Sequence, residues 1–276
     1  MVTPNKEDNQ NNLKLSIQVS LNGLSFCALS KEERRIVYFR DLLFTRKLNP
    51  SQVLREIEKL YEQETFLKEE NPEVIVLFSN ELYSLIPEAY FNEEHASEYL
   101  KYNTKILETD YVAHDEVSVS KMMNVYIPYT NINNFFFDRY GEFEYRHCVS
   151  VLAKEFQIQN KYQTEGTRVY VNCYPGGYDL LVYQQGKLHL ANSFNSATKE
   201  DFIYYLLFTA EQLDLDPTRF ELILLGRIRE HSDYYDIAYN YVKEIKFMDT
   251  AFGYIFSSKE EPPKGYMHYP LFKVLE

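Results

Sequence analysis

Residues 13–21 alternate apolar and polar side chains over nine positions. This period of two is typical of a strand with one buried face. Asn22 and Gly23 follow, a pair that favours a tight hairpin because both residues accept positive φ. Residues 24–29 and 35–44 continue with strand-like runs. The opening pattern therefore predicts three consecutive strands joined by short turns.

A helix is predicted after these strands. Asn49 and Pro50 precede apolar residues at helical spacing, and proline suits a first helical turn. Residues 74–78 then form an unbroken apolar, β-branched run, as expected of a central strand covered on both faces. The first unit is thus strand, strand, strand, helix, strand.

The second half of the chain repeats this order. Residues 167–174, 178–183 and 187–194 are predicted strands, with Pro175-Gly176-Gly177 as the first turn. A helix begins at Thr198, with Asp201 placed for a capping box, and a strand follows at 220–225. The two copies share almost no residue identities, so the repeat rests on the order and spacing of elements. The pattern predicts a duplicated, two-lobed α/β protein.

The remaining segments differ from this unit. Between the copies we expect a strand at 122–127, an aromatic helix at 130–140, a short strand at 143–145 and a helix at 148–156. The closing residues, 249–276, mix Gly, Pro and aromatics and are expected to wrap across a lobe. The expected divisions are a disordered polar lead (1–12), a first lobe (13–110), a connecting subdomain (111–161) and a second lobe (162–276). No long linker separates the lobes, so they should pack together.

The aromatic content is unusual, with 25 Tyr, 19 Phe and no Trp. Tyrosine suits half-buried positions, where the ring is covered and the hydroxyl is wet. It also suits a surface that binds another protein, and the sequence leaves both interpretations open. The same choice applies to Phe135, Phe136 and Phe137, which indicate either core packing between the lobes or an exposed aromatic patch.

Charge and cysteine content narrow the function classes. A net charge of -12 disfavours direct nucleic-acid binding, which depends on clustered Lys and Arg. Cys27, Cys148 and Cys173 are odd in number and far apart, which fits a reducing cytoplasm. The first residues lack the apolar core of a signal peptide, and no later stretch reaches the roughly 18 apolar residues of a membrane span. We expect a cytoplasmic protein without a membrane partner.

The predicted unit resembles the ribonuclease H-like fold, and two such units resemble the actin-like ATPase superfamily. That superfamily includes sugar kinases, Hsp70 chaperones and pilus-assembly proteins. More narrowly, the chain resembles an uncharacterised Bacteroidetes family of this superfamily. The features that carry this likeness are residues 13–21, residues 74–91 with Leu85-Ile86-Pro87-Glu88, Asn124-Val125-Tyr126-Ile127, and the hairpin around Pro175-Gly176-Gly177.

The resemblance implies a nucleotide site between the lobes. In the superfamily the first hairpin of each lobe grips ATP, with an acidic residue ending its first strand and glycine N–H groups facing phosphates. Mg²⁺ requires oxygen ligands there, and phosphates require close backbone donors. If this site persists, the residues that would form it are Asn22, Gly23, Gly176, Gly177 and Gly226. The alternative is that these residues only make turns.

The acidic residues that this chemistry needs are missing from both hairpins. The first hairpin offers Gln18, Ser20 and Asn22 where an aspartate would be expected, and the second hairpin offers Asn172 and Tyr174. Asp179 is displaced onto the following strand. The adenosine loop, usually a glycine pair, is Leu224-Leu225-Gly226-Arg227 here, with one glycine and a bulky cation. Mg·ATP hydrolysis by this route is therefore not expected, and no catalytic residue is assigned.

Other chemistry has little support. The six histidines are scattered and there is no CxxC, so no metal site is predicted. His147 and Cys148 are adjacent, but adjacent side chains diverge on a helix or strand. His114-Asp115-Glu116, near Asp110, could hold a cation, although charge clusters usually mark solvated loops. No GxSxG, P-loop or GxGxxG motif occurs.

The leading hypothesis is a non-catalytic, actin-like interaction scaffold of the cytoplasm, with a protein partner and no cofactor. The alternative is an ATP-dependent switch or kinase with an atypical site. The family resemblance suggests a third role, a protein-mediated accessory function in RNA modification, because genes of that family often neighbour one for a ribosomal RNA methyltransferase. The oligomeric state stays open.

Overall fold

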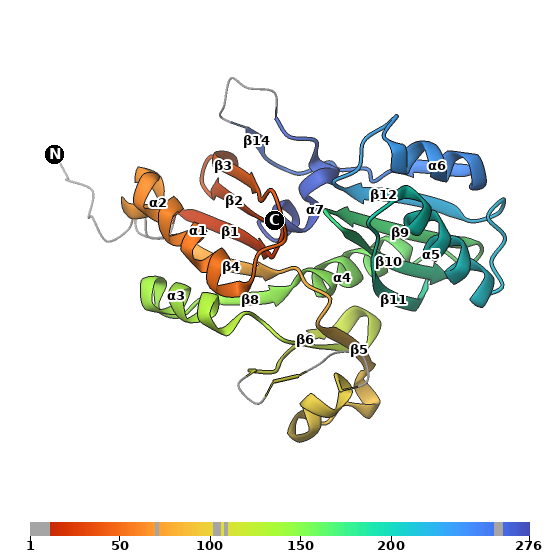
Figure 1. The fold of residues 1–276 in the computed structure, drawn as a ribbon, viewed down its shortest axis with the longest axis horizontal. Coiled ribbons are helices and arrows are strands. Elements are labelled where there is room, and N and C mark those ends of the chain that lie inside the picture. Colours follow the sequence, from red (N-terminus) through yellow and green to blue (C-terminus); the bar gives the residue numbers. More distant parts are fainter. Residues whose placement is uncertain (1–11, 70–71, 102–105, 108–109, 257–261) are drawn as a thin grey trace.

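Two mixed sheets lie beside each other, and a smaller sheet lies below their junction in the view of Figure 1. The computed structural model describes residues 12–69, 72–101, 106–107, 110–256 and 262–276. Residues 1–11 of the expected polar lead lie outside the described residues. We call the unit around the six-stranded sheet lobe 1 and the unit around the five-stranded sheet lobe 2. The two-lobed α/β fold predicted from the pattern is confirmed.

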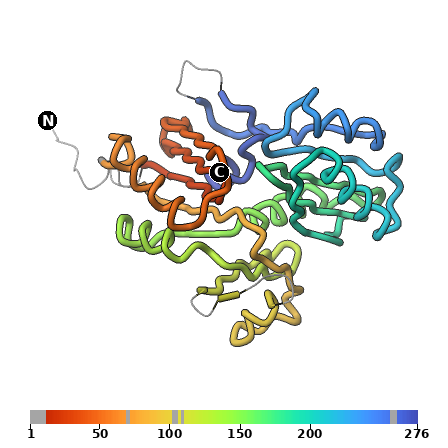
Figure 2. Tube along the Cα trace, in the orientation of Figure 1, coloured from red at the N-terminus to blue at the C-terminus, as the bar shows by residue number. Residues whose placement is uncertain are grey.

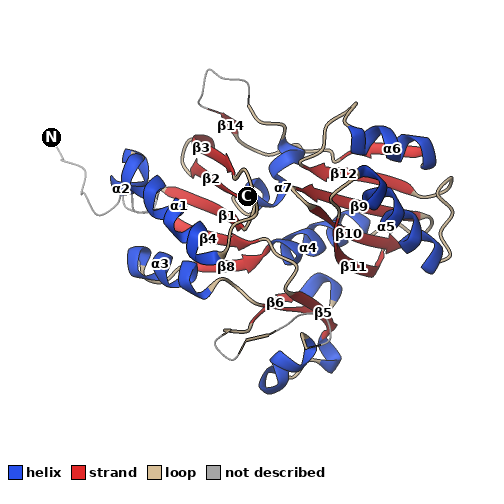
Figure 3. Cartoon of the chain, viewed as in Figure 1, coloured by secondary structure: helices blue, strands red, loops and turns tan. Residues whose placement is uncertain are grey.

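Lobe 1 has the strand order β14-β3-β2-β1-β4-β8. The first three strands of the chain pair antiparallel, whereas β4 lies parallel to β1 and β8 parallel to β4. Its strands are β1 (Leu13–Ser20), β2 (Gly23–Ser30), β3 (Arg35–Leu43), β4 (Glu73–Phe78), β8 (Glu144–His147) and β14 (Ile255–Phe256). Its helices are α1 (Pro50–Gln63), α2 (Thr65–Glu69) and α3 (Thr130–Tyr140), which lie together at one end of Figure 3.

Lobe 2 has the strand order β11-β10-β9-β12-β13. Its strands are β9 (Thr167–Tyr174), β10 (Gly177–Gln184), β11 (Lys187–Asn195), β12 (Glu221–Gly226) and β13 (Glu244–Phe247). Its helices are α5 (Lys199–Gln212) and α6 (Asp233–Tyr241). The sequence pattern did not predict α6, β13 or the short helix α2.

The duplication holds at the level of single residues. Equivalent strands of the two lobes have equal lengths: β1 and β9, β2 and β10, and β3 and β11. The equivalent helices α1 and α5 are also equal in length. Both sheets carry a register shift at the same point, between Ala28 and Leu29 in β2 and between Val182 and Tyr183 in β10. Both helices begin with a capping box, at Asn49 and at Thr198. The equivalences used below follow from these shared registers.

The segment expected as a connecting subdomain divides among three places. Its strands β6 (Ala113–Val117) and β7 (Met122–Tyr126) form the small sheet with β5 (Tyr83–Pro87), in the order β5-β7-β6. Strand β8 joins lobe 1, and helix α4 (Cys148–Asn160) lies between the lobes. Because strand pairing joins residues far apart in sequence, a contiguous segment need not form one unit. The domain boundaries themselves stay a prediction.

The two lobes each cover part of the other. Helix α4 follows β8 of lobe 1 but packs against β10 and β11 of lobe 2. The last helix, α7 (Tyr269–Lys273), follows lobe 2 in sequence but packs against β1 and β2 of lobe 1. Figure 2 shows the C-terminal residues returning to this junction, which agrees with the expected wrapping segment.

Aromatic side chains fill the junction. Phe156 of α4 stacks on Tyr170 of β9 with ring centroids 3.9 Å apart, and both are fully buried. Phe272 of α7 packs against Cys27 and Leu29 of β2 in a separate cluster. Contiguous apolar burial of this kind holds lobes together far better than a polar interface does.

Two expectations about local structure are wrong. The first hairpin turns at Leu21 and Asn22, while Gly23 begins β2, and neither Asn22 nor Gly23 has positive φ. The Phe135–Phe137 run does not pack between the lobes: Phe136 is fully buried in the core of lobe 1, and Phe137 is 60% exposed. Helix α3 packs on α1, so its buried face belongs to lobe 1.

Candidate functional site

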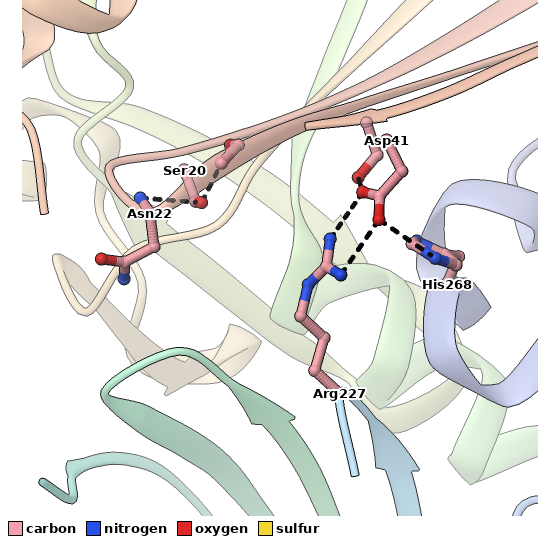
Figure 4. A network of polar contacts seen from close by, with 7 residues as sticks. Ser20, Asn22, Asp41, Arg227 and His268 are labelled. Carbon is pink, nitrogen blue, oxygen red and sulfur yellow. Dashed lines mark hydrogen bonds and ion pairs between the residues drawn. The ribbon is translucent and has the colours of Figure 1, made fainter. Parts of the chain in front are cut away.

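The tips of the first hairpins of the two lobes touch each other. Asn22 Nδ2 donates a hydrogen bond to the backbone oxygen of Pro175 at 2.9 Å. Asn22 is itself held by Ser20, whose Oγ accepts from the Asn22 backbone N–H at 3.2 Å (Figure 4). The place where the resemblance expects nucleotide phosphates is therefore spanned by a direct contact between hairpins.

Three of the expected nucleotide-binding glycines pack against neighbouring backbone. A Cβ at Gly23 would lie 2.5 Å from Leu42 O, and one at the equivalent Gly177 would lie 2.5 Å from Phe194 O. Gly226 has φ +77°, and a Cβ there would lie 2.2 Å from the backbone oxygen of Cys173. Close approach of the neighbouring strand accounts for Gly23 and Gly177, and positive φ with a close backbone contact accounts for Gly226. These contacts would require glycine at the three positions whether or not a ligand is present.

Gly176 is the exception among the expected residues. It has φ +84°, and no neighbouring atom lies within 4 Å of the position that a Cβ would take, so only its backbone conformation requires glycine. It is exposed at the tip of the second hairpin. A turn needs such a residue whether or not a ligand is present.

Each lobe pairs a serine with an aspartate across its second and third strands. In lobe 1, Ser25 of β2 donates to Asp41 of β3 at 2.8 Å. In lobe 2, Ser193 of β11 donates to Asp179 of β10 at 2.7 Å. The two pairs occupy equivalent positions with the residue types exchanged between the strands. Carboxylates are thus present in both lobes, with Asp179 one strand beyond the position that the resemblance expects and Asp41 two strands beyond it.

Asp41 forms an ion pair with the opposite lobe. Arg227, directly after Gly226, donates to Asp41 Oδ2 from Nη1 at 3.0 Å and to Oδ1 from Nη2 at 2.5 Å. Burial is the largest influence and would raise the pKa of Asp41, but Arg227, His268 and Ser25 together outweigh it and hold that pKa below its ordinary value. We call the contact between Asp41 and Arg227, drawn in Figure 4, the interlobe ion pair.

His268 completes the surroundings of Asp41 without adding charge. Its Nε2 lies 3.8 Å from Asp41 Oδ2, and burial lowers the pKa of His268 to about 4. The ring is therefore neutral near pH 7 and acts as a packing partner for Phe39, 5.2 Å away in an edge-on arrangement. The charge of Asp41 is balanced by Arg227.

Asp179 has no cation beside it among the residues that the structure describes. It is 3% exposed and also accepts from Asn172 Nδ2 at 2.9 Å, while Tyr83 Oη lies 3.1 Å from Ser193 Oγ. Burial raises the pKa of Asp179 to about 6, and the hydrogen bonds oppose this only in part. The side chain is a covered carboxyl that gains a proton at mildly acidic pH.

Within the described residues, the junction contains carboxylates but no cluster of metal-ligating side chains. No group of three or more His, Cys, Asp or Glu among the described residues is placed to hold a metal ion. Four cavities lined by described residues measure about 230, 400, 470 and 550 Å³. None of these four is lined by Asn22, Asp41, Arg227 or the expected glycines.

The adjacent pair His147 and Cys148 is not arranged for catalysis. His147 Nδ1 accepts from the Val149 N–H at 3.2 Å and Nε2 lies 3.0 Å from Asn80 O, so backbone groups occupy both ring nitrogens. Burial lowers the pKa of His147 to about 3 and raises the pKa of Cys148 well above its ordinary value. The histidine caps helix α4, and the thiol stays protonated.

The acidic cluster around residue 115 is a strand and not the solvated loop that its charge suggested. Asp115 lies in β6 and accepts from the His147 backbone N–H at 2.8 Å and from Tyr126 Oη at 3.1 Å. Burial raises its pKa above the ordinary value. Its neighbours His114 and Glu116 are exposed, because alternate residues of a strand face opposite sides.

Sequence reasoning missed Asp41 and His268. One signal was present: a large cation, Arg227, stands where a second glycine was expected, and a half-buried cation needs an acidic partner. The partner could not be chosen from the sequence, because Asp41 lies 186 residues away from Arg227.

Comparisons with known proteins agree with the two-lobed fold. The protein family described as "Protein of unknown function (DUF3822)" matches residues 3–245. A search of the curated proteins finds no match. A Bacteroides thetaiotaomicron protein with an actin-like ATPase fold and unknown function superposes with a TM-score of 0.78 at 20% identity, over 89% of this chain and 94% of that one. The PilM–PilN type IV pilus biogenesis complex gives a TM-score of 0.57 at 10% identity, over 95% of this chain and 98% of that one.

These likenesses concern the fold. Identities of 20% and 10% are too low to carry residue roles from one chain to the other. The fold is that of the actin-like ATPases. Within the described residues, no helix is both long and apolar enough to span a membrane.

Proposed function

The chain belongs to the DUF3822 family, and from that membership and the geometry of the lobes we propose that it is a non-catalytic, actin-like interaction scaffold. In this proposal, contacts between side chains of the two lobes hold the lobes together where the superfamily uses a bound nucleotide. The interlobe ion pair between Asp41 and Arg227 is the observation that carries it.

The electrostatics of the junction support this proposal. In the superfamily, the Mg²⁺ ion that accompanies the phosphates needs a carboxylate that is free to face it. Asp41 instead gives both carboxylate oxygens to Arg227, and Asp179 is covered and partly neutral. A guanidinium that is bound to Asp41 by two hydrogen bonds takes the place of the charge that a metal would supply.

A non-catalytic scaffold acts by binding another protein, so the proposal includes a protein partner. One solved structure with this fold is a complex of two proteins, PilM and PilN, in type IV pilus biogenesis. An actin-like fold can therefore take part in a protein assembly. The exposed aromatic residues of the chain, such as Tyr90 and Tyr239, would suit contacts of this kind.

The first experiment measures the thermal unfolding of the full chain with and without millimolar Mg·ATP. We expect Mg·ATP to leave the Tm of the wild type and of Arg227→Met unchanged. The same should hold for the matched control Arg229→Met, whose exposed side chain lies two residues further along. A ligand present at 100 times its Kd would stabilise the fold by about 2.7 kcal/mol, which raises Tm by several degrees. Such a rise in the wild type would overturn the proposal in favour of a nucleotide-dependent switch.

The second experiment purifies the tagged full chain from its own cells and identifies the proteins that remain bound. We expect at least one stable partner. Recovery of an RNA-modifying enzyme would favour the accessory role in RNA modification. A chain that retains no partner and does not self-associate would contradict the scaffold role.

A further inference from the structure

The small sheet touches lobe 2 through its edge strand β5 (Figure 1). Tyr83, the first residue of β5, is 6% exposed, and its Oη lies 3.1 Å from Oγ of Ser193 in β11. The chain enters β5 from β4 of lobe 1, so this hydrogen bond reaches across the junction to the other lobe. It therefore joins the small sheet to a unit that is not its neighbour in sequence.

The hydrogen bond continues to a buried carboxyl. Ser193 Oγ also lies 2.7 Å from Asp179 Oδ1, and Asp179 is 3% exposed. A serine hydroxyl has one proton, so when Asp179 is ionised Ser193 donates to the carboxylate and accepts from Tyr83. Asn172 donates to the other carboxylate oxygen at 2.9 Å. All of these donors are neutral.

The titratable groups that face Asp179 come from β5, α4, β9 and the connection between β4 and β5. Burial raises the pKa of four of them and keeps them uncharged near neutral pH: Tyr83, Cys148, Cys173 and Tyr174. The fifth, Glu81, forms an ion pair with Lys47 at 3.0 Å, and its negative charge raises the pKa of Asp179. Within the described part of the chain, the junction therefore sets a like charge opposite Asp179 and no cation in contact with it.

An ionised Asp179 is more stable in water than in this junction. Burial raises its pKa to about 6, whereas an aspartate in water has a pKa of about 4. The covered state thus binds the proton more tightly. It is favoured at acidic pH, and it loses this advantage as pH rises through about 6. Uncovering Asp179 therefore becomes easier toward neutral pH.

Little packing opposes a movement of β5 away from β11. A cavity of about 400 Å³ separates residues 83–85 of β5 and Met122 from residues 188–192 of β11. The apolar side chains of its walls are only partly buried: Leu85, Met122, Leu188 and Ala191. Regions with few buried apolar contacts open locally at low cost in free energy.

The small sheet has other attachments that such a movement would keep. Asn80, at the end of β4, donates to Ile127 O at 3.0 Å, and Asn124 of β7 donates to Ser150 Oγ of α4 at 2.8 Å. None of these groups titrates, and none belongs to lobe 2. The interlobe ion pair also stays charged near neutral pH, because the pKa of Asp41 is lowered. Release of β5 therefore does not require the lobes to separate.

We infer that the small sheet is a pH-operated gate on lobe 2: protonated Asp179 holds it closed through Ser193 and Tyr83, and ionisation of Asp179 favours its opening. The inference does not depend on the scaffold role proposed above. Between pH 5 and pH 7 the ratio of open to closed gate should rise about tenfold, and it should change little above pH 7.

Double electron–electron resonance measures the gate in the full chain, with one spin label on each side. Tyr90→Cys lies just after β5, and Tyr239→Cys lies on α6 of lobe 2. Both tyrosines are exposed and the three native cysteines are buried, so only the introduced thiols take the label. We expect a second, longer distance whose population relative to the first rises about tenfold from pH 5 to pH 7. A distance distribution that is the same at both pH values would overturn the inference.

Three variants test the role of Asp179. Asp179→Asn cannot ionise, so the two populations should keep the same ratio at pH 5 and pH 7, and a persistent rise would contradict the gate. Glu81→Gln removes the facing charge and should reduce the rise below tenfold, which keeps the inference testable if Asp179→Asn does not fold. Ser193→Ala removes a hydrogen bond that lowers the pKa of Asp179, so the rise should continue above pH 7.

A second label pair distinguishes the gate from a separation of the lobes. Glu58→Cys, at an exposed position of α1, combined with Tyr239→Cys reports the distance between lobe 1 and lobe 2. We expect one distance that is unchanged between pH 5 and pH 7. A pH-dependent distance in this pair would show that whole lobes move and would contradict a gate formed by the small sheet. Failure of the gate would leave the scaffold role in place, because recovery of a partner tests that role.

Discussion

Lobe 1 and lobe 2 carry a serine–aspartate pair at equivalent points of their second and third strands, with the aspartate on opposite strands, and use it differently. Asp41 in lobe 1 faces Arg227 of the other lobe and stays ionised, whereas Asp179 in lobe 2 is covered, has no cation beside it among the described residues and has its pKa raised to about 6. Both accept a hydrogen bond from the cross-strand serine. The difference teaches that the duplicated sheet supplies the position, while the surroundings decide the charge.

The turn that presents Arg227 is the most sensitive part of this comparison. We expect Gly226→Ala to destabilise the fold by about 3 kcal/mol or more, because alanine would combine positive φ with a Cβ 2.2 Å from Cys173 O. Gly176→Ala is the matched control, since it has positive φ but open space, and should cost about 1 kcal/mol. Urea unfolding measures both. Equal losses would show that the close contact at Gly226 relaxes freely.

The two aspartates should give pH dependences of opposite sign. The folded-state pKa of Asp179 is raised, so its contribution to stability is present below the unfolded pKa near 4 and is lost as pH rises through about 6. The pKa of Asp41 is lowered, so its contribution is present above pH 4 and is lost in more acidic solution.

Urea unfolding from pH 3 to pH 8 on Asp179→Asn and Asp41→Asn measures this contrast. Asp179→Asn should remove a dependence on the order of 3 kcal/mol between about pH 4 and pH 6. Asp41→Asn should lower stability above about pH 4 and remove only the fall in stability at the acidic end of the profile. A wild-type profile that is flat between pH 4 and pH 7 would contradict the raised pKa of Asp179.

The interlobe ion pair should contribute a moderate amount. Arg227→Met leaves Asp41 without its cation, and because Arg227 and Asp41 are 21% and 24% exposed, solvent screens part of the loss. We expect destabilisation of about 2 kcal/mol at pH 7, against less than about 0.5 kcal/mol for Arg229→Met. A double-mutant cycle with Asp41→Asn should show a coupling of at least about 1 kcal/mol. Additive effects would mean that the pair does not hold the lobes together.

The contact between the hairpin tips should matter least. Asn22→Ala removes one hydrogen bond to Pro175 at a solvent-accessible position, so we expect a loss of about 0.5 kcal/mol. Thermal unfolding measures this loss. A loss above about 2 kcal/mol would mean that the tips, and not the ion pair, carry the closure of the lobes.

Much of the fold was available from local patterns. Period-two alternation in residues 13–21 and helical spacing after Pro50 predicted β1 and α1 with nearly correct bounds. The capping box at Thr198 and Asp201 formed as predicted. These features depend on neighbours within about four residues, so the sequence displays them directly.

The candidate site was only partly available. Glycine marked the turns at Gly176 and Gly226, because positive φ leaves a local signature. The acidic run at residue 115 suggested a solvated loop, but Asp115 is half-buried in strand β6 and accepts a hydrogen bond from the His147 backbone N–H. A short charged strand has no periodicity strong enough to overcome its composition.

The sequence by itself determined the order of elements, their duplication and the absence of the expected acidic residues from both hairpins. Only the tertiary structure decided that Asp41 meets Arg227, that Asp179 is covered, and that β14 pairs with β3. The physical reason is range: periodicity and capping act over a few residues, whereas ion pairing, burial and strand order depend on segments that chain folding brings together from far apart.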